Sequence, residues 1–496
     1  MDRQPGGARR RILIVSDVSG PGLGGVPVFN QELTEALARE HDVTLLTADR
    51  DTIPHPGAKI VSIGVPEGVE MRDALAEAAA RDPRSYGLAD PEQSPYDLII
   101  GHSRFSGPAA AALRENWYPN ARVAHFLHTS PERLDALKGQ PQKGVTKAEI
   151  ECEVMQKVDL VVGVGPLLTE EARRLSTQAG ARVPGSHELI PGTKIDEPVQ
   201  YSGPKDRLNL LVMGRTDDPI KGVDDALAAV NLLRSEGLDV HLTVRGADPA
   251  SLQRIQQQAE RLAGGREAVT VLPFTKDSAE LRNDIRGADA VIMPSKHEGF
   301  GLVATEAAGH GVPILVNEES GAARFLGDPQ RIPSEIGKPC VVAEPPDPDM
   351  RPEAWADAIS RLKEELPQRQ QNAMQLREAL KGYSWDHSAH ALTEAAMRTT
   401  PATHHAGVGN GQRIHASVQA AHGQLITQEA PSPPGAEGEA RAVAELLAKE
   451  NPNLRGRLAA RRATPLQGRE KPVSERPTLP RQVPHQGTSQ DKGPSR

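Results

Sequence analysis

The sequence predicts an α/β protein of two doubly wound, parallel-sheet domains with a cleft between them, followed by a largely disordered C-terminal tail. Three observations predict this fold class. At 496 residues the chain is too long for one ordinary hydrophobic core. From Arg11 onward, short β-branched runs alternate with longer amphipathic patterns, as in a parallel sheet with crossover helices. The alternation then begins again at Leu208, after a polar connection that contains two prolines.

The first domain is expected over residues 1–196. Helical spacing over Val28–Arg39 follows its first strand. Its strands are predicted from short apolar runs: Ile12–Ser16, Val43–Thr47, Lys59–Ile63, Leu98–Gly101, Arg122–Leu127, Leu160–Val164 and Glu188–Ile190. The interdomain connection is placed at Ile195–Lys205.

The second domain is expected over residues 197–383. Its strands are predicted at Leu208–Met213, Val240–Val244, Val269–Leu272, Ala290–Met293 and Pro313–Val316. Open parallel sheets bind ligands beyond the carboxyl ends of their strands, so the cleft is the expected working site. Residues 401–496 are rich in Gly, Pro, Gln and Ser and are expected to be mostly disordered, with one helix indicated at Gly438–Leu454.

Composition and charge exclude several classes of protein. A net charge of -8, with 66 acidic and 58 basic residues, predicts no nucleic-acid partner. Cys152 and Cys340 lie far apart without metal-ligand spacing, so neither a disulfide framework nor a metal site is expected. The apolar run near the start is too short for a signal peptide, and no run has the length of a membrane span. A cytoplasmic protein is expected, with peripheral membrane contact left open.

A glycine-rich loop, SDVSGPGLGGVPVF, joins the first strand to the first helix. Its backbone amides suit a phosphate group at a helix N-terminus. Gly20, Gly22 and Gly25 also match the G-x-G-x-x-G spacing of dinucleotide-binding domains, and Asp49 follows the second strand. Pro21 and Pro27 remove amide donors and weaken that interpretation. A loop without any ligand is a further alternative.

Two cations follow the first strand of the second domain, in LVMGRTDDPIKG. Arg215 and Lys221 form a natural pair for a diphosphate, because a guanidinium fork and an ammonium group both donate to phosphate oxygens. The alternative is a solvated pair of charges beside Asp217 and Asp218. Their place at a strand's carboxyl end favours anion binding.

Two glutamates enclose a glycine-rich turn in HEGFGLVATE. Glu298 lies in the turn, and Glu306 lies one to two turns into a helix that is expected to begin at Leu302. Each carboxylate can therefore contact a different part of one extended polar ligand. Helix capping alone would not explain the glycines on both sides of Phe300.

The run HEGFGLVATEAAGHGVPILV resembles the E-x7-E region of the retaining glycosyltransferases of family 4, which have the GT-B architecture of two Rossmann-like domains. GRTDDPIKGVDDAL resembles that family's diphosphate clamp, and GPGLGGVPVFNQEL resembles its N-terminal glycine loop and first helix. The likeness covers roughly residues 11–395. It includes GYSWDHSAHAL, which resembles the helix that crosses back to the first domain, expected around 384–400.

The resemblance implies a role for each matching residue. Glu306 would bind the ribose hydroxyls of the donor, and Glu298 would contact the donor sugar near the reacting carbon. Arg215 and Lys221 would neutralise the leaving diphosphate, and His128, in HFLHTSPER, would lie beside the donor sugar. Backbone groups would close around the donor at Gly24 and Gly25 in the first domain and at Gly299, Phe300, Gly301 and Leu302 in the second.

The expected activity is transfer of a sugar from a nucleotide-diphosphate sugar, with retention of anomeric configuration and without a metal or other cofactor. The D-x-D string at Asp347 and Asp349 is interpreted as a turn. The acceptor, whether glycan, lipid or small molecule, is left open, with Arg104–Pro108 and Pro131–Gly144 as its expected binding loops. Two alternatives remain: a catalytically silent GT-B protein that binds a nucleotide sugar, and an NAD(P)-dependent oxidoreductase.

Overall fold

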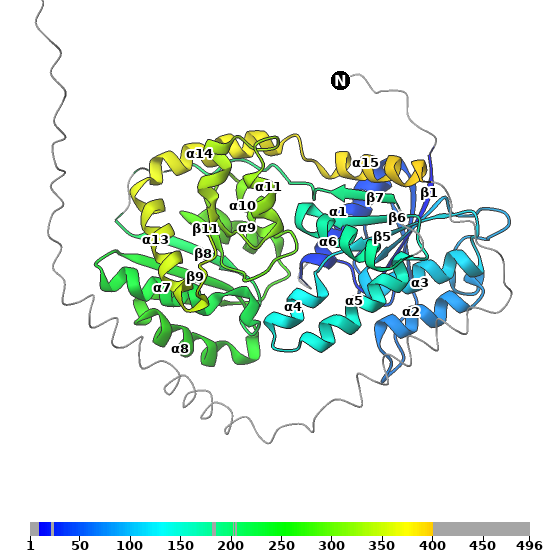
Figure 1. Ribbon diagram of the computed structural model, residues 1–496, viewed down its shortest axis with the longest axis horizontal. Helices are drawn as coiled ribbons and strands as arrows, with labels where there is room; N and C mark the ends of the chain where they lie inside the picture. Colours follow the sequence, from blue (N-terminus) through cyan, green and yellow to red (C-terminus); the bar gives the residue numbers. More distant parts are fainter. Residues whose placement is uncertain (1–8, 21–23, 181–184, 202, 204–205, 400–496) are drawn as a thin grey trace, which may run out of the picture. The chain divides into compact units, whose positions relative to one another are not determined.

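The computed structural model describes residues 9–399, with gaps at 21–23, 181–184, 202 and 204–205 (Figure 1). The predicted tail at 401–496, including the helix predicted at 438–454, lies outside the described residues. Gly22 of the glycine loop and part of the predicted interdomain connection also lie outside them.

The first half of the chain forms a seven-stranded parallel sheet in the order β3-β2-β1-β4-β5-β6-β7. The strands are β1 (Arg11–Ser16), β2 (Asp42–Thr47), β3 (Ala58–Ser62), β4 (Leu98–His102), β5 (Arg122–Leu127), β6 (Leu160–Val164) and β7 (Gly185–Leu189). The central strands are buried along almost their whole length, which explains why they appear in the sequence as continuous apolar runs.

Helices connect these strands and cover the sheet. They are α1 (Gly25–Glu40), α2 (Met71–Ala80), α3 (Ser103–Asn116), α4 (Pro131–Leu137), α5 (Pro141–Met155) and α6 (Gly165–Gln178). In α1 the apolar side chains Phe29, Leu33 and Leu37 recur at helical spacing and are buried in the core. Pro27 is tolerated because it lies in the first turn, where backbone amides have no intrahelical partner.

The second half forms a six-stranded parallel sheet in the order β10-β9-β8-β11-β12-β13. Its strands are β8 (Leu208–Met213), β9 (Val240–Ala247), β10 (Val269–Pro273), β11 (Ala290–Met293), β12 (Ile314–Asn317) and β13 (Val341–Val342). Its helices are α7 (Val223–Ser235), α8 (Leu252–Ala263), α9 (Ser278–Gly287), α10 (Leu302–Gly309), α11 (Gly321–Gly327), α12 (Ser334–Gly337), α13 (Arg351–Glu364) and α14 (Leu366–Leu380). The predicted fold class, two Rossmann-like parallel-sheet domains, is confirmed.

The last described helix, α15 (Trp385–Arg398), packs against the first sheet rather than the second (Figure 1). It contacts α1, β5 and β7, and Arg39 of α1 donates a 2.6 Å hydrogen bond to Asp386. Trp385 is buried with its ring 5.2 Å from that of Phe29. The segment that resembles the crossing-back helix therefore returns to the first half of the chain.

The carboxyl ends of the strands determine where ligand-binding loops lie. In the second sheet the strand order reverses between β8 and β11, which are hydrogen-bonded neighbours. The segment with Arg215 and Lys221 follows β8, and the segment with Glu298 follows β11. Both segments therefore flank the topological switch point, where open α/β sheets bind their ligands.

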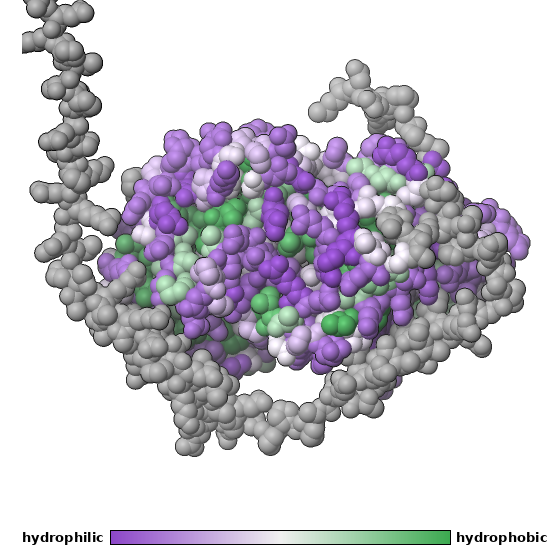
Figure 2. Space-filling view, in the orientation of Figure 1, coloured by the Kyte–Doolittle hydropathy of each residue, from purple (hydrophilic) through white to green (hydrophobic). Residues whose placement is uncertain are grey.

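Apolar residues fill the sheets and the helices that cover them, so polar residues are expected at the surface. Figure 2 shows a face dominated by polar and charged residues, with small apolar patches between them. No helix among the described residues has both the length and the apolar character needed to cross a bilayer.

Candidate active site

The segment after β8 holds both predicted diphosphate-binding cations. The Arg215 guanidinium is 68% exposed and donates a 2.7 Å hydrogen bond to the Asp218 carboxylate. Lys221 ends a short 3-10 helix, Pro219–Lys221, whose first turn is capped by Asp218. Gly222 follows in the left-handed region, and a β-carbon there would lie 2.1 Å from the carbonyl oxygen of Pro294. The close approach of these two loops fixes Lys221 beside the segment that follows β11.

Lys221 and Glu298 are in direct contact. The Lys221 ammonium donates a 2.6 Å hydrogen bond to the Glu298 carboxylate, although the two residues are 77 positions apart. Both side chains are about three-quarters buried, with 27% and 24% exposure. The structure therefore brings together one residue from each of the two motifs in the second domain. Arg215 is held separately by Asp218.

The two glycines of the E-x7-E turn are required for different structural reasons. Gly301 has a φ of 97° and begins α10 as its N-cap, a conformation that a residue with a β-carbon rarely adopts. Gly299 allows a close approach, because a β-carbon there would lie 2.5 Å from the His128 carbonyl oxygen. Between them Phe300 is buried, with its ring 6.1 Å from that of Phe325. Phe300 can therefore offer a ligand only its backbone, whereas Leu302 remains partly exposed at the start of α10.

Glu306 lies in the second turn of α10 and is exposed to solvent. Desolvation by the surrounding protein raises its pKa to about 6, and the nearby Glu32 carboxylate adds to this shift. Lys194 opposes the shift and is itself paired with Glu32 of α1. The Glu306 carboxylate is thus more readily protonated than that of an ordinary glutamate.

The described part of the glycine loop is open. Gly24 has a φ of 106° and is the N-cap of α1, which begins at Gly25. Within the described part of the chain, no heavy atom beyond the adjacent residues lies within 4 Å of a β-carbon built at either glycine. Gly24 and Gly25 are exposed at the N-terminus of this 16-residue helix, the position that an anion site requires.

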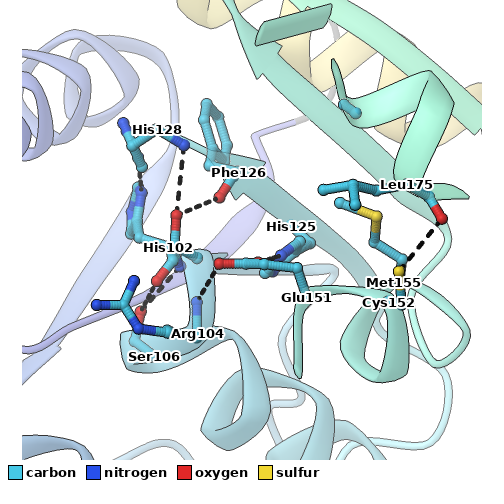
Figure 3. A network of polar contacts seen from close by, with 12 residues as sticks. His102, Arg104, Ser106, His125, Phe126, His128, Glu151, Cys152, Met155 and Leu175 are labelled. Carbon is cyan, nitrogen blue, oxygen red and sulfur yellow. Dashed lines mark hydrogen bonds and ion pairs between the residues drawn. The ribbon is translucent and has the colours of Figure 1, made fainter. Parts of the chain in front are cut away.

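His128 is partly buried and belongs to a network of polar side chains at the carboxyl ends of β4 and β5 (Figure 3). Its Nε2 lies 2.9 Å from Nδ1 of His102, the last residue of β4. Burial, followed by the charge of His125, lowers the pKa of His128 to about 3. Burial also holds the pKa of His102 well below its usual range. Both rings are therefore neutral near pH 7, and one must donate to the other.

The same network fixes the start of α3. Glu151 is fully buried and accepts hydrogen bonds from the Arg104 backbone amide and from His125, at 2.8 Å each. Ser103 is the only described residue other than glycine with a positive φ, at 45°, and its hydroxyl donates to the Phe126 carbonyl oxygen. A strained residue held by several hydrogen bonds is typical of a functional loop.

The sequence prediction missed His102, although one feature indicated it. His102 directly follows the apolar run Leu98–Gly101, so it had to lie at the same sheet edge as the residues after β5. Its hydrogen bond to His128 could not be deduced, because side-chain direction depends on packing against Phe29 and Phe126.

Other predicted features lie away from this constellation. Asp347 caps a short 3-10 turn by accepting from the Asp349 amide, as the interpretation of the D-x-D string as a turn requires. Asp49 closes a local turn by accepting from the Asp51 amide. Among residues 9–399 that are described, no group of three or more His, Cys, Asp or Glu is arranged to hold a metal ion.

Comparison with known protein families decides the classification. A family model described as "Family 4 Glycosyltransferase in conflict systems" matches residues 13–392. The chain belongs to this family. The predicted membership of family 4 is confirmed, and the family covers both sheets, the E-x7-E turn and most of α15.

Curated relatives agree with this assignment. The chain is 26% identical over 436 residues to a D-inositol 3-phosphate glycosyltransferase from Xylanimonas cellulosilytica, covering 80% of this chain and 98% of the relative. It is 29% identical over 335 residues to a protein of the same name from Nocardia farcinica, covering 64% and 70%. This family 4 glycosyltransferase is therefore similar to enzymes named for transfer to an inositol phosphate.

Solved structures show the same architecture. A sucrose-phosphate synthase from Thermosynechococcus elongatus superposes with a TM-score of 0.61 at 23% identity, covering 79% of this chain and 99% of that one. An α,α-trehalose-phosphate synthase from Burkholderia xenovorans, in complex with glucose-6-phosphate, gives 0.59 at 14% identity, covering 78% and 100%. Both neighbours support the GT-B fold of this glycosyltransferase.

Proposed function

We propose that this family 4 glycosyltransferase moves a sugar from a nucleotide-diphosphate donor to a hydroxylated acceptor, with retention of anomeric configuration and without a metal ion. The contact between Lys221 and Glu298 carries the proposal. It joins the cation expected at the leaving diphosphate to the carboxylate expected at the donor sugar. A donor that spans this pair would have its glycosidic bond near the switch point between β8 and β11.

The donor's charge is expected to be neutralised by protein groups. Breaking the bond between C1 and the phosphate oxygen leaves an electron pair, and negative charge, on the departing diphosphate. Lys221 and Arg215 would stabilise that charge from the second domain, and the α1 amides at Gly24 and Gly25 from the first. Glu306 would accept hydrogen bonds from the ribose hydroxyls. We assign no step to a cofactor.

Retention would follow from attack on the face that the diphosphate leaves. The acceptor hydroxyl forms the new bond to C1, and its proton passes to the departing phosphate oxygen. His128 would pack beside the donor sugar as a neutral imidazole, because its pKa is about 3. Its role in this proposal is to donate or accept one hydrogen bond, since it cannot supply a charge near pH 7.

The relatives suggest which acceptor to test first. Enzymes named for D-inositol 3-phosphate and a neighbour in complex with glucose-6-phosphate both point to phosphorylated polyols. Acceptors would approach from the first domain, where Arg104 and Ser103 follow β4.

The proposal is tested in two stages on the full-length protein. Thermal shifts with UDP-, GDP- and ADP-sugars, measured against NAD(P)H, identify the nucleotide, because a ligand that binds the folded state raises its apparent stability. NMR of the product made with D-inositol 3-phosphate or a panel of phosphorylated sugars then gives the anomeric configuration. Stabilisation by NAD(P)H alone, an inverted product, or donor binding without turnover on any acceptor would contradict the proposal.

A further inference from the structure

A second pocket lies next to the Glu298 segment, and its lining includes none of the residues assigned to the donor. Residues of α4, α6, the β11–α10 loop and α11 line it, and its volume is about 400 Å³. This size is within the range of ~300–1,000 Å³ that is usual for small-molecule sites. We call it the α4–α6 pocket. Its polar lining residues include Ser130, Glu170, Glu171, Arg174, His297 and Arg324.

The α4–α6 pocket is separated from the donor site by the protein backbone. Glu298 forms a parallel β-bridge with Ser320, so the backbone around it is extended. Neighbouring side chains in an extended segment point to opposite sides, and Glu298 reaches Lys221 while His297 lines the pocket. On the next residue, Gly299 lies against the His128 carbonyl oxygen. The two sites therefore share one segment but face away from each other.

His297 is the side chain of this pocket whose hydrogen-bonding groups most clearly indicate a ligand. Its side chain is only 3% exposed, yet neither ring nitrogen has a hydrogen-bond partner among the described residues. Burial, followed by the positive charge of Arg133, lowers its pKa to about 4, so the ring is neutral near pH 7. A neutral imidazole offers one donor and one acceptor. Leaving both unpaired in a buried position is costly, and a hydroxyl group of a bound ligand would satisfy one of them.

Most other charges of the α4–α6 pocket are already paired. Arg174 donates to both carboxylate oxygens of Glu171 at 2.7 and 2.9 Å, and it also bonds Glu132. The Ser130 hydroxyl donates to Glu171 at 2.8 Å. These contacts fix the α4 and α6 wall of the pocket before any ligand binds, which reduces the ordering cost of binding.

Two charged side chains in the α4–α6 pocket have no side-chain hydrogen bond or ion pair with the described residues. Arg324 of α11 is exposed, and within the described part of the chain its guanidinium makes no hydrogen bond or ion pair. Glu170 of α6 is likewise exposed and unpaired among those residues. A guanidinium fork suits a phosphate or carboxylate, whereas a carboxylate accepts from hydroxyl groups. An anion alone would satisfy Arg324 and leave Glu170 and His297 without partners.

We propose that the α4–α6 pocket is a second ligand site, which binds a hydroxylated anion of the sugar-phosphate class. The anionic group would lie on Arg324, and the hydroxyl groups would bond His297 and Glu170. The helices α4 and α6 lie in the half of the chain that forms the first sheet, and α11 lies in the half that forms the second. The ligand would therefore contact both halves of the molecule. This proposal does not depend on the identity of the donor or on transfer activity.

Calorimetric titration of the full-length protein tests the site, with glucose 6-phosphate, glucose and inorganic phosphate as probes. We expect glucose 6-phosphate to bind more tightly than either part alone and to bind equally well with UDP present. Arg324→Gln and His297→Asn should each weaken binding about tenfold or more, since a hydrogen bond to a charged or buried group is lost. The control is Arg261→Gln, which changes an exposed arginine of α8 and should bind like the unchanged protein.

Arg324→Gln is the decisive variant, because Arg324 is exposed and its change should not disturb folding. The proposal is overturned if this variant binds glucose 6-phosphate as tightly as the unchanged protein, if UDP displaces the probe, or if inorganic phosphate binds as tightly as glucose 6-phosphate. Donor binding is measured separately by titration with UDP. Because Arg324 has no role in the proposed reaction, weaker glucose 6-phosphate binding in Arg324→Gln with unchanged UDP binding assigns the probe to the α4–α6 pocket rather than to the acceptor site.

Discussion

Replacement of Lys221 by Met separates a catalytic role for the Lys221–Glu298 pair from a structural one. Met keeps most of the aliphatic side chain and removes the ammonium group. Lys221 and Glu298 are partly exposed, at 27% and 24%, so their ion pair contributes about 0–1 kcal/mol to the free energy of unfolding. For a protein of this size that corresponds to a fall in Tm of no more than about 4 °C.

The expected effect on turnover is much larger. A preorganised group that stabilises charge in the transition state is typically worth ~3–4 kcal/mol, or about 10²- to 10³-fold in kcat. If Lys221 stabilises the leaving diphosphate, Lys221→Met should therefore lower kcat by at least about 100-fold. Mere loss of an ion pair would give a small change in Tm and almost no change in kcat. The two magnitudes differ enough to decide between the roles.

Lys296→Met is the matched control. Lys296 lies on the same loop as Glu298, is 25% exposed and forms an ion pair with Asp225 at 3.7 Å. It resembles Lys221 in burial and pairing but has no assigned donor contact. Release of the nucleoside diphosphate from the donor identified by thermal shift is measured for both variants, together with Tm. The reasoning is refuted if Lys221→Met keeps more than about a third of the kcat, or if both variants lose activity equally.

Three further substitutions, at Glu306, Arg215 and Gly301, have expected outcomes of their own. Donor affinity should weaken about tenfold from pH 7 to pH 5 as Glu306 is protonated through its pKa of about 6, and Glu306→Gln should abolish this dependence in a KM–pH profile. Because the ionised form is disfavoured in the folded state, Glu306→Gln should also raise Tm above pH 6 but not below about pH 4.5. Arg215→Gln should raise the donor KM without lowering Tm, since the guanidinium is 68% exposed; an unchanged KM would remove Arg215 from the donor site. Gly301→Ala should cost about 1–3 kcal/mol in chemical denaturation, because φ is 97° and the Met293 sulfur lies 2.7 Å from the added carbon; an unchanged midpoint would contradict this.

The sheets could be predicted from the sequence because buried parallel strands leave continuous apolar runs. The predicted bounds of β5, β6, β8 and β11 match the structure at both ends. The prediction of β7 at Glu188–Ile190 was wrong by three residues at its start, because the strand begins at Gly185 and is exposed there. The two-residue strand β13 was missed, since so short a run gives no period to detect.

The site could be predicted only as far as strand order determines it. Residues that follow β8 and β11 must meet at one edge of the sheet, and the contact between Lys221 and Glu298 is the result. The raised pKa of Glu306 could not be predicted in this way. It arises from desolvation where the two halves pack and from the Glu32 carboxylate of α1, and Lys194, in the segment after β7, opposes it.

The two glycines of the E-x7-E turn are required for two different reasons, one local to the backbone and one a contact with a distant segment. Gly301 is required by its own backbone, because a φ of 97° begins α10 at the correct angle. Gly299 is required by a contact with another part of the chain, the His128 carbonyl oxygen at the end of β5. The first requirement is local and would exist in an isolated second domain. The second exists only where the two halves touch, so the same short string specifies both a helix start and the wall between the donor site and the α4–α6 pocket.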